Sequence, residues 1–332
     1  MNKSLRLLTI KGIDIRVHLT FPLIFLWAAY QFGTIYDSMS GAIFGIVSIS
    51  MLFILVTLHE LGHSFAARMY GVPVKQIILS PIGGVAQLAR IPDKPTQELV
   101  IAIAGPAVNI LMAFVIAAVG FAFGLELTSL ATVFSTSEAA TVAALISYIF
   151  MANLFLAVFN LLPAFPMDGG RVLRALLAMR LDYARATNIA ATIGRVVAVL
   201  FGIYGLFNGG IFMIFIAFFI FTAAGQEAKY SRVRQALDGY TVQQAYSASA
   251  YRLHPSYSLE QAKNLAAYSR QQEFAVVDGD WLTGYLTSSA LNEALHANPS
   301  YIPVSSVMDR QIRPVTPEMG LFKVQQRLVE ES

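Results

Sequence analysis

The chain has 332 residues, of which 56% are hydrophobic and only 13% are charged, whereas a soluble globular protein has about 25% charged residues. Because nearly all long apolar runs precede Gly225, this composition favours a polytopic α-helical membrane protein with a smaller soluble tail. The net charge of +3 without a dense basic run argues against nucleic acid as a partner, and the absence of cysteine excludes disulfides and thiolate metal ligands.

Six apolar segments reach, or nearly reach, the roughly 20 residues that a helix needs to cross the hydrocarbon core of a membrane. They are expected over Val17–Phe32, Gly41–Phe65, Leu99–Leu125, Ala139–Leu161, Ile189–Phe207 and Gly210–Ala224. The charged residues 1–16 lead into the first segment without a small-residue cleavage site, so we expect a retained helix rather than a signal peptide.

Lysine and arginine fall only in alternate connections between these segments. The basic groups are Lys3, Arg6, Lys11 and Arg16; Arg68, Lys75, Arg90 and Lys94; Arg171, Arg174, Arg180 and Arg185; and Lys229, Arg232 and Arg234. The connections Gln31–Ser40, Glu126–Glu138 and Asn208–Gly209 contain neither. Because basic loops stay on the cytoplasmic side, we expect a multi-pass membrane protein with both termini in the cytoplasm. The plasma (inner) membrane is the expected location.

The sequence His59-Glu60-Leu61-Gly62-His63 lies near the cytoplasmic end of the second segment. Residues four apart share one face of a helix, so His59 and His63 can direct both imidazoles at one metal ion, with Glu60 beside them. Ionisable groups at membrane depth are costly unless they serve a function. A hydrogen-bonded histidine pair, or a purely structural metal site, is the alternative.

The fourth segment also runs inward, and the sequence after it, from Asn160 to Arg171, reaches the same depth. A catalytic zinc needs three protein ligands and one open position for water. Asp168 is the best third ligand because it is an ionisable group in an apolar region. The prolines before it and the glycines after it can also turn its side chain out of a helix. Asp168 can alternatively cap the helix that follows.

With His59, His63 and Asp168 as ligands, one Zn²⁺ per chain would lower the pKa of its bound water toward about 7. Glu60 would take a proton from this water and pass it to the leaving amine. The Asn160 amide can stabilise the developing oxyanion or hold the substrate carbonyl, or it can simply bond a neighbouring helix. The residues therefore predict a zinc hydrolase that works at membrane depth.

The segment Val72–Leu88 alternates strand-forming residues with proline and glycine, which predicts a β-hairpin at the membrane edge. Its free edge could bind an unwound substrate as an added strand. Gly83 and Gly84 would then lie at the contact, unless these two glycines only form the turn. Asn109, in the third segment, is either a hydrogen-bonding residue between helices or a substrate contact.

Four spaced motifs together resemble those of the site-2 protease family of intramembrane zinc metalloproteases, over about residues 10 to 225. They are His59-Glu-Leu-Gly-His63, the segment Gly71–Ala86 with its Pro73, Pro81 and Gly83-Gly84, Ala104-Gly105-Pro106-Ala-Val-Asn109, and Asn160-x-x-Pro163-x-x-Pro166-x-Asp168-Gly169. The resemblance implies a fold of membrane helices around one zinc ion.

That resemblance also implies an activity. The family cleaves membrane-spanning helices, commonly after another protease has trimmed the extracytoplasmic part of the substrate, so single-span membrane proteins are the implied substrates. By resemblance the zinc ligands are His59, His63 and Asp168, the general base is Glu60, and Asn160 engages the substrate.

Composition changes after Ala224, which predicts a transmembrane domain over 1–225, a linker helix over 226–238 and a soluble α/β domain over 239–332. In the soluble domain the patterns predict a helix near Ser258–Tyr268, strands at Glu273–Val277 and Trp281–Thr287, and a helix at Ser288–His296.

This order of elements resembles a cystathionine-β-synthase (CBS) domain, a module that often binds adenine nucleotides. A second copy of the module begins at Pro303 but lacks its strand pair and final helix. Either the sequence is truncated there, or contacts in a dimer complete the second copy. Nucleotide-binding copies usually carry Asp three residues after the strand-end Thr, and here that position is Ala290. We therefore favour a structural or homodimerising tail over a nucleotide sensor.

Two other functions fit part of the sequence. A transporter or channel would also place histidine and aspartate within the membrane, but it leaves Glu60 unexplained. A catalytically silent scaffold would not need Glu60, because inactive relatives of proteases tend to lose the base.

Overall fold

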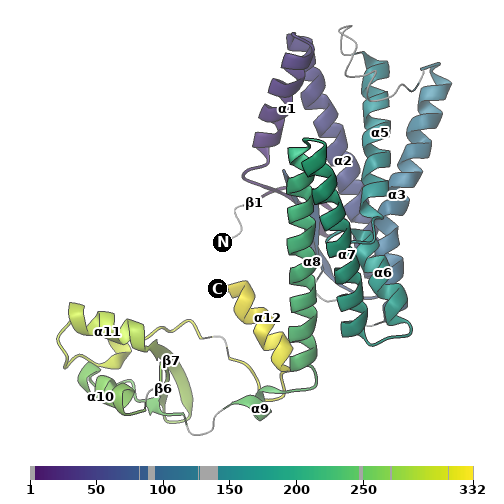
Figure 1. The fold of residues 1–332 in the computed structure, drawn as a ribbon. Coiled ribbons are helices and arrows are strands. Elements are labelled where there is room, and N and C mark those ends of the chain that lie inside the picture. Colours follow the sequence, from purple (N-terminus) through teal and green to yellow (C-terminus); the bar gives the residue numbers. More distant parts are fainter. Residues whose placement is uncertain are drawn as a thin grey trace. The chain divides into compact units, whose positions relative to one another are not determined.

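The computed structural model describes residues 4–81, 83–88, 94–125, 127, 141–246, 250–269, 271–312 and 314–331. Within it the chain forms two compact units, Met1–Arg232 and Val233–Ser332, and each is described by itself (Figure 1). Arg90, and the expected connection over Glu126–Glu138 apart from Leu127, lie outside the described residues.

In the described part of the first unit, seven helices run largely side by side (Figure 1). They are α1 (Pro22–Ile35), α2 (Met39–Met69), α3 (Pro95–Ala122), α5 (Val142–Asn160), α6 (Asp168–Ala178), α7 (Tyr183–Phe207) and α8 (Ile211–Leu237), whose end enters the second unit. Among the described residues five of these, α2, α3, α5, α7 and α8, are long and apolar enough to cross a membrane. The expected spans from the second to the sixth therefore correspond to helices.

The first expected span, Val17–Phe32, differs from the structure. Val17 and His18 belong to a strand, and α1 begins only at Pro22, where the fixed backbone of proline suits a first helical turn. At 14 residues α1 is about 21 Å long, which is short of the roughly 30 Å hydrocarbon core. The expected linker helix over 226–238 is also not separate, because α8 continues through it to Leu237.

A four-stranded sheet packs against α2 and contains the expected hairpin. Its strands are β1 (Ser4–Ile10), β2 (Ile13–His18), β3 (Val74–Ser80) and β4 (Gly83–Leu88), in the order β1-β2-β3-β4. The outer pairs are antiparallel and β2 pairs with β3 in parallel. The inward side chains of β2 and β3 join those of α2 in one core: Ile13, Ile15, Val74, Ile77, Leu79, Ile49, Phe53 and Val56. In this sheet β4 is an edge strand.

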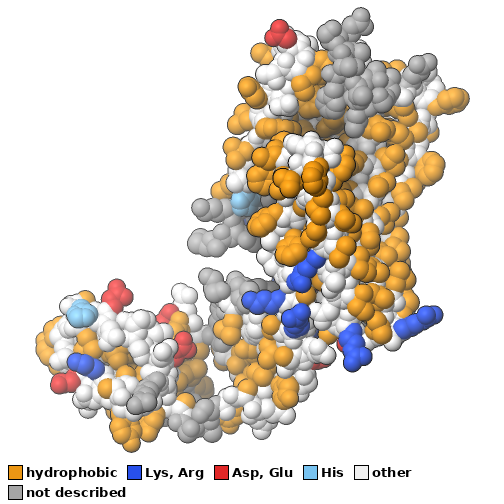
Figure 2. All heavy atoms as spheres, in the orientation of Figure 1, with side chains coloured by type: hydrophobic (Ala, Val, Ile, Leu, Met, Phe, Trp, Pro, Cys, Tyr) orange, Lys and Arg blue, Asp and Glu red, His pale blue; other side chains and the backbone are white. Residues whose placement is uncertain are grey.

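The surface of the first unit separates apolar from basic side chains. In the view of Figure 2, hydrophobic side chains cover the upper part of its helices, whereas lysine and arginine gather toward the lower end. This separation is what the bias of basic residues toward alternate connections predicts.

The second unit contains the elements that its sequence predicts. After α9 (Val242–Ala245) and β5 (Arg252–Leu253) come α10 (Leu259–Ser269), β6 (Glu273–Asp278), β7 (Trp281–Thr287), α11 (Ser288–Ala297), the 3₁₀ turn η1 (Val304–Ser306) and α12 (Leu321–Glu331). The sheet order is β5-β6-β7. Its core is formed by buried side chains of these elements: Leu253, Leu259, Phe274, Val276, Leu286, Leu291 and Val304. The short strand β5 is not anticipated from the sequence.

Candidate metal centre

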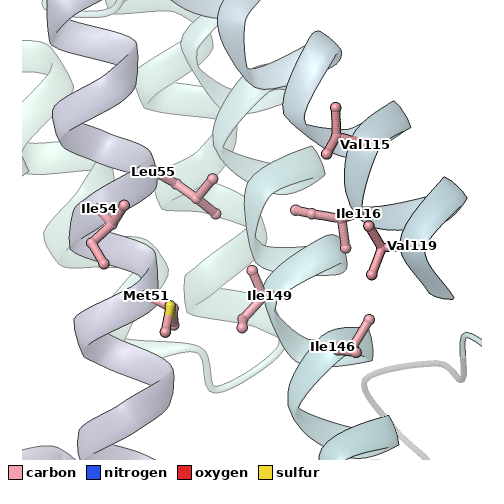
Figure 3. A pocket seen from close by; sticks show the side chains of 8 residues that line it. All are labelled: Met51, Ile54, Leu55, Val115, Ile116, Val119, Ile146 and Ile149. Carbon is pink, nitrogen blue, oxygen red and sulfur yellow. The ribbon is translucent and has the colours of Figure 1, made fainter. Parts of the chain in front are cut away.

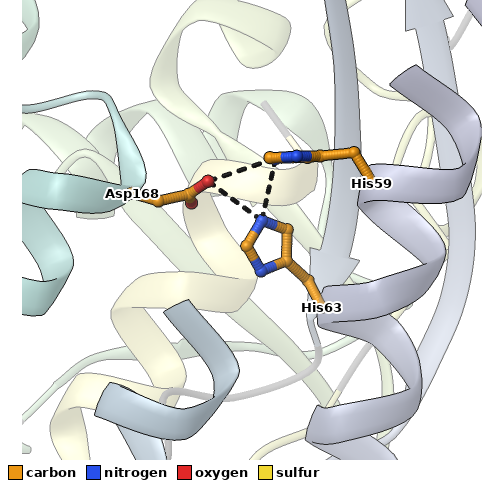
Figure 4. Close-up of side chains that lie close together, drawn as sticks. All are labelled: His59, His63 and Asp168. Atoms are coloured by element: carbon orange, nitrogen blue, oxygen red, sulfur yellow. Dashed lines mark hydrogen bonds and ion pairs between the residues drawn. The ribbon is translucent and has the colours of Figure 1, made fainter. Parts of the chain in front are cut away.

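Three side chains from two helices converge at one buried point (Figure 4). His59 and His63 lie one turn apart on α2, and Asp168 is the first residue of α6. The two Nε2 atoms are 3.1 Å apart, and each is 3.1 Å from Oδ2 of Asp168. The exposed fractions of the three residues are only 4%, 4% and 7%. The structure thus brings together the three ligands that the sequence predicts.

The outer nitrogens of both imidazoles face oxygen atoms that only accept hydrogen bonds. Nδ1 of His59 is 3.2 Å from Oδ1 of Asn109, and Nδ1 of His63 is 2.6 Å from the main-chain oxygen of Ile101. In a neutral imidazole the proton therefore belongs on Nδ1, which leaves the Nε2 lone pair directed at Asp168. Two lone pairs and a carboxylate that meet at one point are a set of donors suited to a metal cation.

The spacing fits a zinc ion. Tetrahedral ligand atoms at about 2.0–2.1 Å from zinc are about 3.3 Å from one another, close to the 3.1 Å separations found here. Two imidazoles and one carboxylate are also a donor set that zinc uses in catalytic sites, where a fourth position stays open. His59, His63 and Asp168 can therefore hold one metal ion.

Asp168 does not cap α6. Met167 occupies the cap position without a side-chain hydrogen bond, and the Asp168 carboxylate turns toward the two histidines instead. The turn before it is tight: a side chain at Gly169 would have its Cβ 2.2 Å from the main-chain oxygen of Leu162. Glycine at this position lets the start of α6 fold back against the end of α5, which aims Asp168 at α2.

A buried ionic cluster fixes α6 to its neighbours. Arg174, less than two helical turns after Asp168, donates from Nε to Oε1 of Glu98 on α3 over 2.9 Å and also bonds Glu227 on α8. Its guanidinium lies 4.9 Å from the ring centre of Phe165 and 5.0 Å from that of Tyr183. Removing one partner of a buried ion pair typically costs about 3–5 kcal/mol because the other charge is left unpaired. The pairing of Arg174 with Glu98 therefore links the helix that carries Asp168 to α3.

Two glycines allow α2 and α3 to approach closely at the metal site. A Cβ on Gly62 would lie 2.8 Å from the main-chain oxygen of Ala104, and a Cβ on Gly105 would lie 2.2 Å from Nε2 of His63. The sequence suggests that Gly105 and Pro106 serve packing at the start of the third span. The structure places both well inside α3, which begins at Pro95. The imidazoles of His59 and His63 occupy the space that a Cβ at position 105 would need.

Glu60 lies beside the cluster and contacts the edge strand. Its Oε2 accepts a hydrogen bond of 3.1 Å from the main-chain N–H of Ala86 in β4. A Cβ on Gly84 would come within 2.9 Å of Cγ of Glu60, so β4 passes directly along this carboxylate. The edge of the sheet and the candidate base are therefore adjacent.

The other candidate site residues have different surroundings. Asn160 is the last residue of α5 and is half-buried. Gly83 has φ of 135°, and no atom of the described residues lies within 4 Å of where its Cβ would stand, so its side of the hairpin is open toward that part of the chain. Asn109 is only 1% exposed, and its side-chain oxygen on α3 faces His59 on α2, which is the arrangement of the first of its two expected roles, a hydrogen-bonding residue between helices.

An apolar cavity of about 260 Å³ lies between α2, α3 and α5 (Figure 3). Only aliphatic side chains and one methionine line it: Met51, Ile54, Leu55, Val115, Ile116, Val119, Ile146 and Ile149. Leu55 lies one turn before His59 on α2, yet the lining offers no polar group. The cavity contributes no chemistry to the site.

Sequence reasoning missed the residues behind the ligands. Glu98 and Arg174 are 1% and 3% exposed, and Asn153 is fully buried. The signal that could have found them is the presence of a charged or amide side chain within or next to an apolar segment, where such groups need partners. Their partners are distant in sequence, so the pairings themselves could not be read.

Comparison with known proteins agrees with this site. The family model described as peptidase family M50 matches residues 47–201, which include all three ligands and Glu60. A zinc metalloprotease of Methanocaldococcus jannaschii is 34% identical over 86% of this chain and 78% of its own length. Stage IV sporulation protein FB of Bacillus subtilis is 26% identical over 72% and 74%. The solved site-2 protease from Methanocaldococcus jannaschii is 39% identical, with a TM-score of 0.49, over 68% of this chain and 95% of that one.

Proposed function

Because the chain belongs to peptidase family M50, the site-2 protease family of zinc metalloproteases, we propose that it is an intramembrane endopeptidase that cleaves single-span membrane proteins. The observation that carries this proposal is the buried cluster of His59, His63 and Asp168 with Glu60 beside it. The two histidines and Glu60 lie on α2, a helix long and apolar enough to cross a membrane. A metalloprotease gives Glu60 a role as the general base, whereas a transporter or a catalytically silent scaffold gives it none.

The residues divide the work of peptide hydrolysis. His59, His63 and Asp168 would hold the zinc ion, which when bound would act as a Lewis acid and lower the pKa of a water molecule. Glu60 accepts a proton from the attacking water on its carboxylate and then donates it to the leaving amine. Asn160 can donate from its amide nitrogen to the substrate carbonyl oxygen as negative charge develops there.

The proposal predicts metal-dependent cleavage within an apolar segment. The full-length chain, purified in detergent, is incubated with a single-span membrane protein whose extracytoplasmic part has been removed, as expected for a substrate trimmed beforehand by another protease. Mass spectrometry of the fragments should place the cut inside the span. A chelator should abolish cleavage and added Zn²⁺ should restore it. Cleavage that persists in the metal-free protein, or cuts only outside the span, would contradict the proposal.

We further propose that the substrate binds as an added strand on β4. A helix hides its peptide bonds, so hydrolysis requires local unwinding, and an edge strand offers unpaired backbone groups to an extended chain. Since β4 runs along Glu60 through Gly84 and Ala86, a segment paired with it would lie next to the base. The open side of Gly83 leaves room at the hairpin end.

A proline scan of the substrate tests strand pairing. Proline removes the backbone N–H, and alternate residues of a paired strand direct their N–H groups toward the partner. The cleavage rate should therefore decrease when proline stands at every second position near the cut, and it should be retained when proline stands at the positions between. If unwinding alone controlled cleavage, proline would promote it at all positions without alternation, which would exclude strand addition.

We also propose a side of the membrane for the two termini and a role for the C-terminal tail. The bias of basic residues supports cytoplasmic termini in a plasma (inner) membrane, which a reporter fused after Ser332 checks.

The second unit supports a CBS-like regulatory or homodimerising tail. Thr287 caps α11 by accepting from the N–H of Ala290, the position where an aspartate would be needed for ribose. Saturable micromolar binding of an adenine nucleotide to the full chain would reverse this view of the tail.

A further inference from the structure

The two zinc-facing histidines are held from behind in different ways. Nδ1 of His63 meets a main-chain oxygen, that of Ile101, which any residue at that position would supply. Nδ1 of His59 meets a side-chain oxygen, Oδ1 of Asn109. The ring orientation of His59 therefore depends on the identity of one residue on α3, whereas that of His63 does not.

Asn109 is in turn held by a second asparagine. Asn153 on α5 donates from Nδ2 to the main-chain oxygen of Asn109 over 2.7 Å, and both residues are fully or almost fully buried. His59, Asn109 and Asn153 thus form a polar chain across α2, α3 and α5, three helices whose facing surfaces are otherwise mostly apolar.

The way these amides are used argues against a role as interhelical contacts alone. Nδ2 of Asn109 and Oδ1 of Asn153 are buried and have no hydrogen-bond partner among the residues that the structure describes. Two asparagines selected only to join helices would be expected to satisfy each other's amides. Here the side-chain contact that Asn109 does make is directed at a metal ligand.

We propose that Asn109, supported by Asn153, is a positioning residue for the metal centre. By accepting the proton of Nδ1 it fixes the tautomer and the ring plane of His59, so that the lone pair of Nε2 faces Asp168 and the ion. This inference rests on the assignment of His59 as a zinc ligand in the proposed function.

The test exploits a feature of the contact between α3 and α5. Asn153 bonds the main chain of Asn109, so this link survives any side chain at position 109. Asn109→Leu, which has similar volume, removes only the contact with His59. The full-length variant in detergent is titrated with Zn²⁺ against a competing chelator. We expect its zinc dissociation constant to rise about 10–100-fold, and Asn109→Asp, which restores an accepting oxygen, to recover most of the affinity.

Control variants separate this effect from damage to the helix bundle. Ser48→Ala removes a fully buried polar group elsewhere in the bundle, on α2, and the zinc affinity of this variant should match that of the wild type. If Asn109→Leu does not fold, Asn109→Ser keeps a polar side chain that is too short to reach His59, and it should weaken zinc binding similarly.

Either folded variant binding zinc as tightly as the wild type would overturn the positioning role while leaving the protease proposal intact. A wild-type chain that binds no zinc would instead remove the metal assignment on which both proposals rest.

Discussion

Replacing Glu60 by glutamine is expected to leave zinc bound and to slow cleavage by about 10²–10⁴-fold, the usual contribution of general acid–base catalysis. Glutamine has the shape of glutamate and keeps a side-chain oxygen that can accept from the N–H of Ala86. The three ligand side chains do not depend on it. What the variant lacks is a group that can take a proton from water and return it to the leaving amine.

The measurement pairs zinc content per chain with the cleavage rate of a single-span substrate. Glu260→Gln, an exposed position in the first turn of α10, makes the same chemical change away from the site and should leave both values unchanged. A Glu60→Gln protein that cleaves within tenfold of the wild type would show that another group is the base. Loss of zinc from this variant would assign Glu60 a structural role instead.

The convergence of His59, His63 and Asp168 could be predicted because its signals are local. His59 and His63 are one helical turn apart, and a regular helix alone brings them together. Asp168 required a weaker argument, based on its depth and on the prolines and glycines around it, and the structure brings its carboxylate to the two histidines. In each case the residue's own chemistry and immediate neighbours carried the information.

The elements that could not be predicted depend on pairing between distant parts of the chain. Residues 4–18 carry the charges typical of a cytoplasmic lead-in, yet they form β1 and β2. Their stability comes from the parallel partner β3, whose register joins Ile15 to Ile77. No local sequence pattern predicts a parallel strand pair, since its two strands are always separated by a long connection. The hydrogen bond from the N–H of Ala86 to Glu60 also joins residues far apart in sequence, and no local pattern predicts it.

The buried charges show a further limit. The sequence assigns Arg174 to a basic cytoplasmic connection, where it contributes to orientation. In the structure it is 3% exposed and joins α6 to Glu98 and Glu227. A count of basic residues treats every arginine alike, whereas burial depends on which helices pack around it. Orientation is therefore better supported by the arginines that stay exposed.

Replacing Gly105 by alanine is expected to weaken zinc binding by at least about 100-fold, beyond the range seen for outer contacts of metal ligands. The new Cβ would lie 2.2 Å from Nε2 of His63 and 2.8 Å from Cε1 of His59. No side-chain contact is stable at such distances, so the imidazoles must leave the positions from which they face Asp168. Because alanine favours a helix interior over glycine by about 0.5–1 kcal/mol, α3 itself should not be destabilised.

Gly202→Ala supplies the matched control. It makes the same change inside α7, where the new Cβ would lie 3.5 Å from Cβ of Ala217, an ordinary contact. Both variants should remain folded by circular dichroism and gel filtration in detergent, and only Gly105→Ala should lose zinc in a chelator competition. If Gly105→Ala binds zinc as tightly as Gly202→Ala, the two imidazoles have another arrangement that still holds the ion, and the close approach of α3 would not be what shapes the metal centre.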